Sequence, residues 1–494
     1  MLRKIRIALS AAAFAAVTLL FLDFTGTAHR WLGWMAKIQF LPALMALNIG
    51  VIAGLVLLTL VFGRVYCSVI CPLGVMQDIF GYFGKKAKKN RYSYSRPLNW
   101  LRYAMLAVLA IAIAAGVGAV VSLLGPYSAY GRMAQTLLQP VWMWCNNLMA
   151  AMAERADSYA FYTVDVWMKG CITLAVASVT LIVLAILSWR NGRTYCNTIC
   201  PVGTVLGFLS RFSLLRPVID TSKCNGCGLC ARNCKAACIN SREHRIDYSR
   251  CVACMDCIGK CHKNAISYTV RRRPATDSGE TAAPSDGARR SFLAVTAVTA
   301  ATAVASAAGK TVDGGLAAIT AKQAPRRRTP IVPPGAVSLD NLTERCTACQ
   351  LCVAACPNGV LRPSTDLARL MKPESSYERG YCRPECTRCS EVCPAGAIRP
   401  ISRADKSSTR IGHAVWVKAN CVPLTDGVEC GNCARHCPSG AILMVASDAA
   451  NPESVKIPVV NTERCIGCGA CENLCPASPF SAIYVEGNER HSLI

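Results

Sequence analysis

The arrangement of the cysteines constrains this chain more than any other feature. Of the 31 cysteines in 494 residues, 24 fall into six sets of four with short, recurring spacings. A small secreted protein with this cysteine content would carry disulfides, but repeated clusters in a long chain indicate metal ligands. The sequence therefore predicts several domains, some of them built around bound metal.

Two cysteine sets in the middle of the chain follow the spacing CxxCxxCxxxC. Three cysteines on a tight loop can bind three irons of one [4Fe-4S] cluster, and the fourth points to the neighbouring cluster in two-cluster ferredoxins. Zinc also accepts four thiolates, but this spacing favours iron–sulfur clusters. We therefore expect Cys261 to complete the set that begins at Cys224, and Cys234 to complete the set that begins at Cys251. The two sets are Cys224, Cys227, Cys230, Cys234 and Cys251, Cys254, Cys257, Cys261.

Four further cysteine sets lie toward the C-terminus. The outer two keep the regular spacing, whereas the inner two open with a longer gap but retain CxxCxxxCP. They are Cys346, Cys349, Cys352, Cys356; Cys382, Cys386, Cys389, Cys393; Cys421, Cys430, Cys433, Cys437; and Cys465, Cys468, Cys471, Cys475. The sequence thus predicts six [4Fe-4S] clusters in all, and clusters spaced through a small fold form a conduction line for electrons.

The first part of the chain carries four apolar stretches, each long enough or nearly long enough to cross a bilayer as a helix. They are residues 5–24, 40–62, 103–124 and 170–188. Alternate flanking segments hold 15 against 5 Lys and Arg residues, which places both ends of this domain in the cytoplasm. The net charge of +25 does not require nucleic acid, because anionic clusters and basic membrane flanks account for it.

An internal repeat joins the apolar stretches in pairs. GRVYCSVICPLG at 63–74 returns as GRTYCNTICPVG at 192–203, each time after an even-numbered stretch. The prolines suit a turn into a following helix. Cysteines four residues apart share one helix face, so Cys67, Cys71, Cys196 and Cys200 can converge on a further metal or on a thiol relay. A structural motif at the membrane edge is the alternative. We expect Cys145, Cys171 and Cys238, which stand alone, to be buried packing residues.

Residues 274–335 are rich in Ala, Thr, Pro and Gly and have no ligand cysteines, which indicates a linker. Arg289 and Arg290 precede Ser291 and an Ala/Val/Thr stretch that ends at Ala308. This segment is similar to a twin-arginine export signal. The alternatives are a low-complexity linker with a chance pair of arginines, or a fifth membrane segment.

This combination resembles a fusion of the H and G subunits of the periplasmic nitrate reductase electron supply, a membrane quinol dehydrogenase and its exported 4Fe-4S ferredoxin. The resemblance rests on the apolar stretches, the paired CxxxCP turns, the RRxFL segment and the cysteine sets. It implies that electrons pass from menaquinol or ubiquinol to a periplasmic acceptor. By likeness to four-cluster ferredoxin subunits, it also implies that Cys475 completes the first C-terminal cluster, Cys356 the last, Cys437 the second and Cys393 the third.

The fold expected from these observations is a membrane α-helical domain followed by α+β bacterial-type ferredoxin domains. Its parts are a four-helix membrane domain with an internal duplication (1–215), a two-cluster ferredoxin (216–273), the linker (274–335) and a four-cluster ferredoxin (336–494). We expect a multi-pass protein of the bacterial inner membrane, with the first ferredoxin cytoplasmic and the last one periplasmic if the export signal operates.

The function expected is quinol oxidation with electron transfer to a partner reductase or cytochrome, with the membrane lipid and quinone pool as further partners. Quinol oxidation releases protons, and Asp23, His29 and Asp78 are candidate acceptors, although interfacial polar residues without such a role are common. The alternative function is assembly or regulation of a respiratory metalloenzyme. The four additional cysteine sets favour conduction, because regulation does not need a line of clusters.

Overall fold

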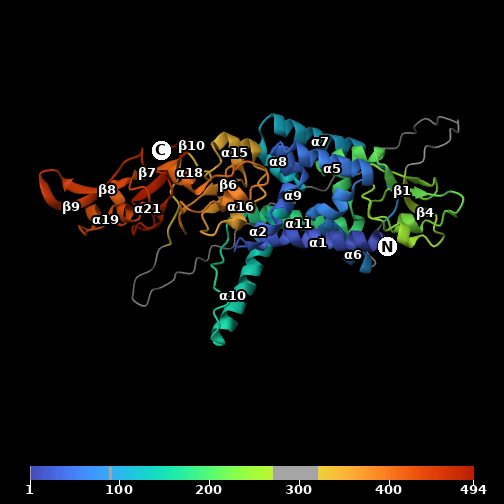
Figure 1. Ribbon diagram of the computed structural model, residues 1–494, viewed down its shortest axis with the longest axis horizontal. Coiled ribbons are helices and arrows are strands. Elements are labelled where there is room, and N and C mark those ends of the chain that lie inside the picture. Colours follow the sequence, from blue (N-terminus) through green and yellow to red (C-terminus); the bar gives the residue numbers. More distant parts are fainter. Residues whose placement is uncertain (1, 88–91, 271–320) are drawn as a thin grey trace, which may run out of the picture.

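The chain forms an elongated molecule with a helical body between two small β-containing domains (Figure 1). The computed structural model describes residues 2–87, 92–270 and 321–494. Of the predicted linker 274–335, residues 274–320 with the export-like segment lie outside the described residues, whereas Ile331 and Val332 are buried, so the linker prediction was wrong at its C-terminal end. The first ferredoxin domain lies at one end of the long axis and the second at the other.

Two helices of the body are long and apolar enough to cross a membrane, as the sequence predicts for these segments. They are α1 (Leu2–Leu22) and α11 (Cys171–Asn191). At 1.5 Å per residue, 21 residues extend about 31 Å, which matches the hydrocarbon thickness of a bilayer. Length and composition therefore support these two spans.

The other two predicted spans are interrupted. The stretch 40–62 divides into α4 (Phe40–Met45) and α5 (Ile49–Phe62), because Asn48 caps α5 by accepting a hydrogen bond from the Val51 amide at 3.3 Å. The stretch 103–124 divides into α7 (Asn99–Ala114) and α8 (Gly118–Leu124) at Gly116, whose φ of +70° ends the helix. The helices α5 and α7 are apolar, but each is shorter than a bilayer is thick.

The two copies of the internal repeat adopt closely similar conformations. In each copy, a glycine with positive φ ends the long helix (Gly63, Gly192) and a proline begins the next one, as predicted. In the first copy, α5 leads through the π-helical turn Tyr66–Ile70 into α6 (Pro72–Lys86). In the second, α11 leads through α12 (Thr194–Thr198) into α13 (Pro201–Leu209).

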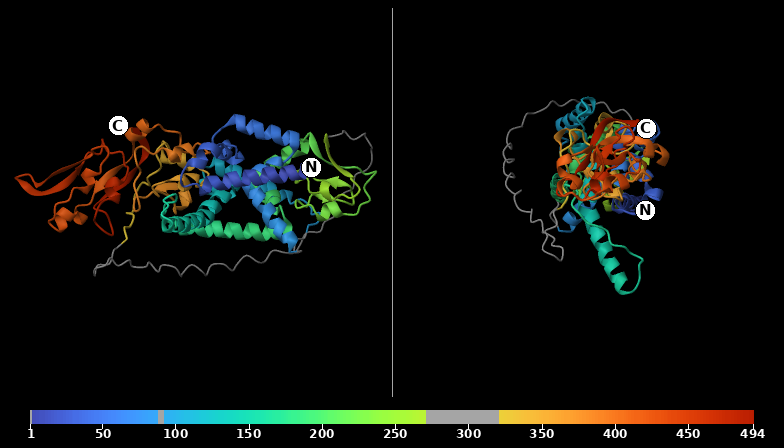
Figure 2. Two further views of the ribbon diagram at one scale, coloured as in Figure 1. Left: turned by 60° about the horizontal axis from the view of Figure 1, so that its bottom comes forward. Right: turned by 90° about the vertical axis from the view of Figure 1, so that its left-hand side faces the viewer.

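The remaining long helix leaves the body. The short helix α9 (Pro126–Met133) is buried at the centre, and a π-helical turn (Ala134–Leu138) connects it to α10 (Gln139–Arg155). Figure 2 shows that α10 projects away from the other helices.

The first ferredoxin domain is closed by its first and last strands. Strand β1 (Leu215–Ile219) pairs antiparallel with β4 (Ile266–Val270), so that Leu215 lies opposite Val270. Between them lie α14 (Leu229–Arg232) and the short hairpin of β2 (Ile239–Asn240) and β3 (Arg245–Ile246).

The second ferredoxin domain consists of two halves of similar construction. The first half contains α15 (Leu339–Arg345), α16 (Leu351–Ala355), α17 (Arg388–Glu391) and the pair β5 (Leu361–Pro363) and β6 (Pro373–Ser375). The second half contains α20 (Asn432–Arg435), α21 (Ala470–Asn473) and the hairpin β8 (Ile442–Asp448) and β9 (Asn451–Val460). Strand β7 (Thr409–Trp416) pairs with the last strand, β10 (Ile483–Leu493).

The two ends of α1 contact different ferredoxin domains. Near its start, Arg3 Nε lies 2.8 Å from Asp256 Oδ1 of the first domain. Just beyond its end, the Phe24 carbonyl accepts a 3.4 Å hydrogen bond from Arg388 of the second domain. The two domains are therefore separated by the length of one membrane-long helix.

We expect Gly131→Ala to loosen the contact between the helical body and the second ferredoxin domain. An added Cβ would lie 2.4 Å from the Cys349 carbonyl oxygen and 2.7 Å from a ring carbon of Phe21. Overpacking of this kind costs about 1–3 kcal/mol. The midpoint of thermal unfolding, followed by loss of visible cluster absorbance in detergent, should fall. The control is Gly54→Ala, whose Cβ would meet no atom within 4 Å and which should leave the midpoint unchanged or slightly raised.

Candidate functional site

The first ferredoxin domain brings together the cysteines expected for its second cluster. Burial, followed by repulsion from Cys254, Cys251 and Cys234, raises the pKa of the Cys257 thiol well above its usual value. Cys234 therefore lies with the set that begins at Cys251, as predicted. In the other set, Cys224 and Cys227 lie within electrostatic range of Cys230. The assignment of Cys261 to that set stays a prediction.

The isolated cysteines behave differently from one another. Cys238 is buried, as predicted, and its sulfur lies 3.5 Å from that of Cys234. The prediction of burial was wrong for Cys145 and Cys171, which are exposed. The reason is their position, since Cys145 lies on the projecting helix α10 and Cys171 begins α11.

In the second ferredoxin domain, the pairing implied by the resemblance is wrong. Burial, followed by repulsion from Cys346, Cys349 and Cys393, raises the pKa of the Cys352 thiol. Cys393 is therefore close enough to the first set to act on its thiols. By the same criterion, the second set lies beside Cys356, the third beside Cys475 and the fourth beside Cys437. Consecutive sets are therefore paired, rather than outer with outer and inner with inner.

The local geometry explains this pairing. Cys356 follows α16 and Cys393 lies just beyond α17, and these two short helices pack against each other. The helices α20 and α21 pack in the same way in the second half. Each half is thus a compact two-cluster unit, in which the fourth cysteine of one set reaches the set next to it in the sequence, as in the first ferredoxin domain.

The two halves meet at the second and fourth sets. The Cys382 amide donates a hydrogen bond to the Cys468 carbonyl at 2.9 Å. Tyr377 lies between these two cysteines and donates its hydroxyl hydrogen to the Gly467 carbonyl at 2.7 Å. The four sets are therefore arranged in the spatial order first, second, fourth, third.

The residues around the cysteine sets fit [4Fe-4S] clusters. Burial and mutual repulsion make it costly to ionise four thiols that lie close together. Bound iron offsets this cost, because its positive charge stabilises the thiolates. Two cations, the buried Lys406 and the half-buried Lys169, lie beside the sets without a carboxylate partner among the described residues. The Lys406 ammonium donates to the carbonyls of Arg383 and Cys386. Burial lowers the pKa of Lys169 to about 8, whereas the nearby Cys356 and Cys352 act in the opposite direction. Anionic clusters would neutralise these cations.

The structure also brings the repeated CxxxCP turns together. Cys71 and Cys200 each lie within electrostatic range of the other cysteines of the two turns. Each of the four side chains is 4% exposed. We call them the repeat tetrad: Cys67, Cys71, Cys196 and Cys200. In the part of the chain that the structure describes, no three His, Cys, Asp or Glu side chains converge closely enough to share one metal ion. This holds for the six sets as well as for the tetrad, since each thiolate of a cubane cluster binds a different iron.

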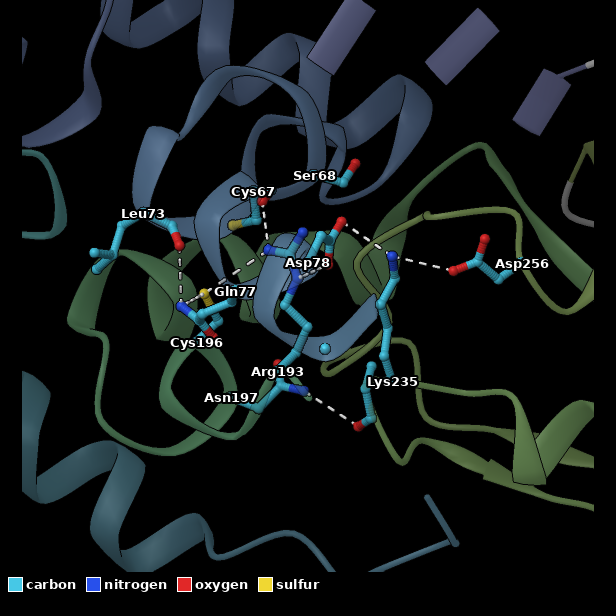
Figure 3. Close-up of polar contacts among 12 residues, drawn as sticks. Cys67, Ser68, Leu73, Gln77, Asp78, Arg193, Cys196, Asn197, Lys235 and Asp256 are labelled. Atoms are coloured by element: carbon cyan, nitrogen blue, oxygen red, sulfur yellow. Dashed lines mark hydrogen bonds and ion pairs between the residues drawn. The ribbon is translucent and has the colours of Figure 1, made fainter. Parts of the chain in front are cut away.

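A buried ionic network lies beside the tetrad (Figure 3). Asp78 accepts from Arg193 at 2.7 Å and from Arg6 at 3.0 Å, and it lies 3.0 Å from Lys235 Nζ. Lys235 also lies 3.1 Å from Asp256. Burial alone would raise the pKa of Asp78, but Arg193 and Lys235 hold it well below its usual range. Asp78 is therefore ionised at neutral pH.

The Asp78 network closes one end of an amphipathic cavity of about 440 Å³. Its polar end contains Asp78 and Asp256 together with five cations, namely Arg3, Arg6, Lys85, Lys235 and Lys260. Its apolar walls come from α1 and α6 and comprise Ile7, Ala11, Phe14, Val75, Ile79 and Phe83. Lys235 follows Cys234 directly, and Asp256 lies between Cys254 and Cys257, so the polar end borders the ligand loops of the second cluster.

The other two candidate proton acceptors have a structural explanation. Asp23 Oδ2 lies 3.2 Å from His29 Nδ1. Asp23 also accepts hydrogen bonds from the amides of Gly26 and Ala28, both at 2.8 Å, and thereby orders the start of α2 (Thr27–Leu32). Asp78 is the candidate that lines the cavity.

Sequence reasoning missed the buried cations around the tetrad. Arg64 and Arg193 are fully buried. The signal was available, because an arginine recurs at the same position in both GRxYCxxxCP copies. Lys235 also gave a signal, since it occupies the position after Cys234 where such sets usually carry proline.

Three parts of the chain match families that bind iron–sulfur clusters. A 4Fe-4S binding domain family matches residues 43–91 and 173–219, which contain the two CxxxCP turns. A 4Fe-4S dicluster domain family matches 426–478, and a second 4Fe-4S binding domain family matches 342–362. No solved structure matches the chain.

The curated relatives include ferredoxin-type proteins. The chain is 31% identical to the ferredoxin-type protein NapG of Escherichia coli over 178 residues, 33% of this chain and 75% of NapG. It is 34% identical to the methylamine utilization ferredoxin-type protein MauM of Paracoccus denitrificans over 188 residues, 35% of this chain and 79% of MauM. It is 23% identical to the putative electron transport protein YccM of E. coli over 241 residues, 48% of this chain. The chain spans 59% of YccM and 38% of an uncharacterized protein of Methanocaldococcus jannaschii.

We expect pairs of cysteine variants to report the cluster pairing in the second ferredoxin domain. If Cys393 and Cys349 bind the same cluster, Cys393→Ala combined with Cys349→Ala removes about four irons per chain, the same as either change alone. Cys393→Ala combined with Cys433→Ala affects two clusters and should remove about eight. Iron and acid-labile sulfide analysis of the purified chain measures both. The reverse pattern would restore the pairing expected from the resemblance.

Proposed function

We propose a function for this chain from the family to which it belongs, the ferredoxin-type electron-transfer proteins that include NapG and MauM. In this proposal the chain oxidises menaquinol or ubiquinol and passes the electrons to a partner reductase. The amphipathic cavity at Asp78 carries this proposal. A quinol has a polar headgroup and a long apolar tail. The cavity offers ionised groups at one end and apolar side chains of α1 and α6 at the other. Its volume of about 440 Å³ lies in the range of small-molecule sites.

The charged end of the cavity suits the orientation of a quinol headgroup. Oxidation of one quinol to a quinone releases two protons and two electrons. Asp78 is ionised and can accept a hydrogen bond from a quinol hydroxyl, but Arg193 and Lys235 keep its pKa far below its usual range, so it would orient the hydroxyl and pass the proton on to water rather than hold it. Bound [4Fe-4S] clusters supply one-electron acceptors, so the two electrons leave one at a time. The ligand loop around Asp256 borders the headgroup position, so the electrons have a short exit.

The second ferredoxin domain would carry the electrons away from the cavity. Its four cysteine sets follow one another without a gap in the fold, because adjacent sets share a two-cluster unit and the halves meet at Cys382 and Cys468. This arrangement supports delivery of single electrons to a partner reductase or cytochrome at the far end of the molecule.

A four-span membrane domain with its ends in the cytoplasm agrees with these contacts. In this proposal, α1 and α11 cross the bilayer, and the interrupted helices α5 and α7 complete the domain together with their neighbours. Because α1 contacts one ferredoxin domain at each end, a crossing by α1 would leave the first domain in the cytoplasm and the second outside it.

We expect Ala11→Trp to slow quinol oxidation. Ala11 and its neighbour Ala12 are both exposed, but only Ala11 lines the cavity. A tryptophan at position 11 would occupy the space of the quinol, so quinol-driven cluster reduction should fall at least about tenfold. Stopped-flow absorbance with a reduced menaquinol analogue measures this rate. Ala12→Trp is the matched control, and dithionite should reduce both variants fully. Equal quinol rates in the two variants would remove the cavity from the mechanism.

We expect residues 336–494 to lie on the outer side of the membrane. A reporter that is active only in the periplasm, fused after the exposed C-terminal residue Ile494, should be active in cells. A cytoplasm-specific reporter at the same position should be inactive. The opposite result would make the second domain a cytoplasmic cluster array on a membrane anchor.

A further inference from the structure

The repeat tetrad is built by two turns that reach across to each other. The Arg193 guanidinium donates to the Cys67 carbonyl at 2.7 Å, and the Arg64 guanidinium donates to the Cys196 carbonyl at 3.2 Å. Each arginine of one repeat thus fixes the cysteine turn of the other. The approach of each arginine depends on glycine, because a Cβ at Gly74 would lie 2.7 Å from Arg193 Nη1 and a Cβ at Gly203 would lie 3.0 Å from Arg64 Nη2.

The sulfurs of the tetrad are surrounded by hydrogen-bond donors. Gln77 Nε2 lies 3.2 Å from Cys196 Sγ, and the Gly203 amide lies 3.4 Å from Cys200 Sγ. A guanidinium nitrogen of Arg64 lies 3.9 Å from Cys67 Sγ. Donors gathered around sulfur are expected where the sulfur is a thiolate, and they tune the potential of iron–sulfur clusters.

The charge balance also requires an anion at this place. Arg64 is fully buried, and in the described residues its hydrogen bonds go only to neutral groups, the side chain of Asn197, the Ser249 and Cys196 carbonyls and the Cys67 sulfur. Arg193 has Asp78 as its counterion, but its Nη2 atom is buried with no hydrogen-bond partner in the described structure. A buried cation without a counterion costs several kcal/mol. Four thiolates around iron would supply the missing negative charge.

The tetrad occupies the space between the two ferredoxin domains. On one side, Arg64 donates to the Ser249 carbonyl at 3.0 Å, and Asn197 donates to the Ala236 carbonyl at 3.2 Å. These carbonyls lie two residues from Cys251 and Cys234. On the other side, buried tyrosines at positions 66 and 127 lie between the tetrad and Cys349 of the second domain.

We propose that the repeat tetrad binds a seventh iron–sulfur cluster, which relays electrons from the first ferredoxin domain to the second. Four cysteines are the ligand set of both [2Fe-2S] and [4Fe-4S] clusters. In each transfer, one electron leaves a reduced cluster of the first domain and reduces the tetrad cluster. The tetrad cluster then returns to its oxidised form as it reduces the first set of the second domain. No proton is needed. The relay rests on the proposed function, whereas binding of the cluster does not.

The test replaces two tetrad thiolates without disturbing the helices they begin. Cys71 and Cys200 are the N-cap residues of α6 and α13. Serine is a preferred N-cap residue, so Cys71→Ser with Cys200→Ser preserves the caps but provides hydroxyls, which are poor iron ligands. The matched control is Cys145→Ser with Cys171→Ser, two exposed cysteines outside the tetrad.

The expected result is the loss of one cluster from the full purified chain. Compared with wild type, the tetrad variant should lose about two or four irons with equal acid-labile sulfide, and one spin per chain in the EPR spectrum of the reduced protein. The number of irons lost identifies the cluster type. The control should match wild type. Unchanged iron, or loss of a metal without sulfide, would overturn the proposal.

Two further measurements do not depend on how that variant folds. Wild-type protein should contain more than the roughly 24 irons of six cubanes, and a full complement of only 24 would overturn the proposal. Gln77→Leu removes the hydrogen bond to Cys196 Sγ and should lower the midpoint potential of one cluster without changing the iron content. A redox titration in which no transition moves would contradict the assignment.

A delay in electron transfer would test the relay separately. With quinol as reductant, the clusters of the first ferredoxin domain should be reduced at the same rate in the tetrad variant as in wild type. The clusters of the second domain should be reduced at least about tenfold more slowly in the variant. Normal rates in both domains would overturn the relay. If quinol reduced no cluster in wild type either, the proposed function would be wrong, while the iron content would still decide the seventh cluster.

Discussion

The buried ion pair between Asp78 and Arg193 connects the main parts of the molecule. Arg193 comes from the second repeat and Asp78 from the helix that follows the first repeat, so their 2.7 Å contact joins the two copies. The same carboxylate binds Arg6 of α1 and Lys235 of the first ferredoxin domain. Removing it would leave the buried Arg193 and Arg6 without a counterion and Lys235 with Asp256 alone, and unpaired buried charges are strongly destabilising. One side chain thus takes part in the docking of α1, the pairing of the repeats and the attachment of the first ferredoxin domain.

Buried positive charge also explains how the cysteine sites are accommodated. Thiolates are costly to bury, and cations at short range offset this cost. Lys406 lies beside the second set of the C-terminal domain, and Lys169 lies between that domain and the helical body. Arg64 lies beside the repeat tetrad in the same way, with a guanidinium nitrogen 3.9 Å from Cys67 Sγ. In a chain with a net charge of +25, part of the excess is thus buried, where clusters would balance it.

The predictions that succeeded rest on local geometry. The CxxCxxCxxxC spacing predicted that Cys234 joins the set at Cys251, because a fourth cysteine carried by a short helical turn reaches only the neighbouring set. The turns at Pro72 and Pro201 followed from the fixed φ of proline at the first helical position. The pairing by resemblance failed for Cys356 and Cys475, because it relied on how distant sets pack rather than on that local rule. The continuous spans predicted for 40–62 and 103–124 failed because hydropathy does not register a cap at Asn48 or a positive φ at Gly116.

The sequence by itself determined the class of cofactor and the duplication and predicted the cysteine sets, since thiolate spacing and repeat identity are properties of neighbouring residues. Only the tertiary structure decided which residues far apart in the sequence lie in contact. It brought Cys67 and Cys71 to Cys196 and Cys200 and buried Arg64 among them. It also placed Asp78 at the polar end of a cavity and gave α1 a ferredoxin domain at each end. The physical reason is that contacts between residues more than a hundred positions apart depend on the packing of whole helices and on the pairing of buried charges, which no local pattern encodes.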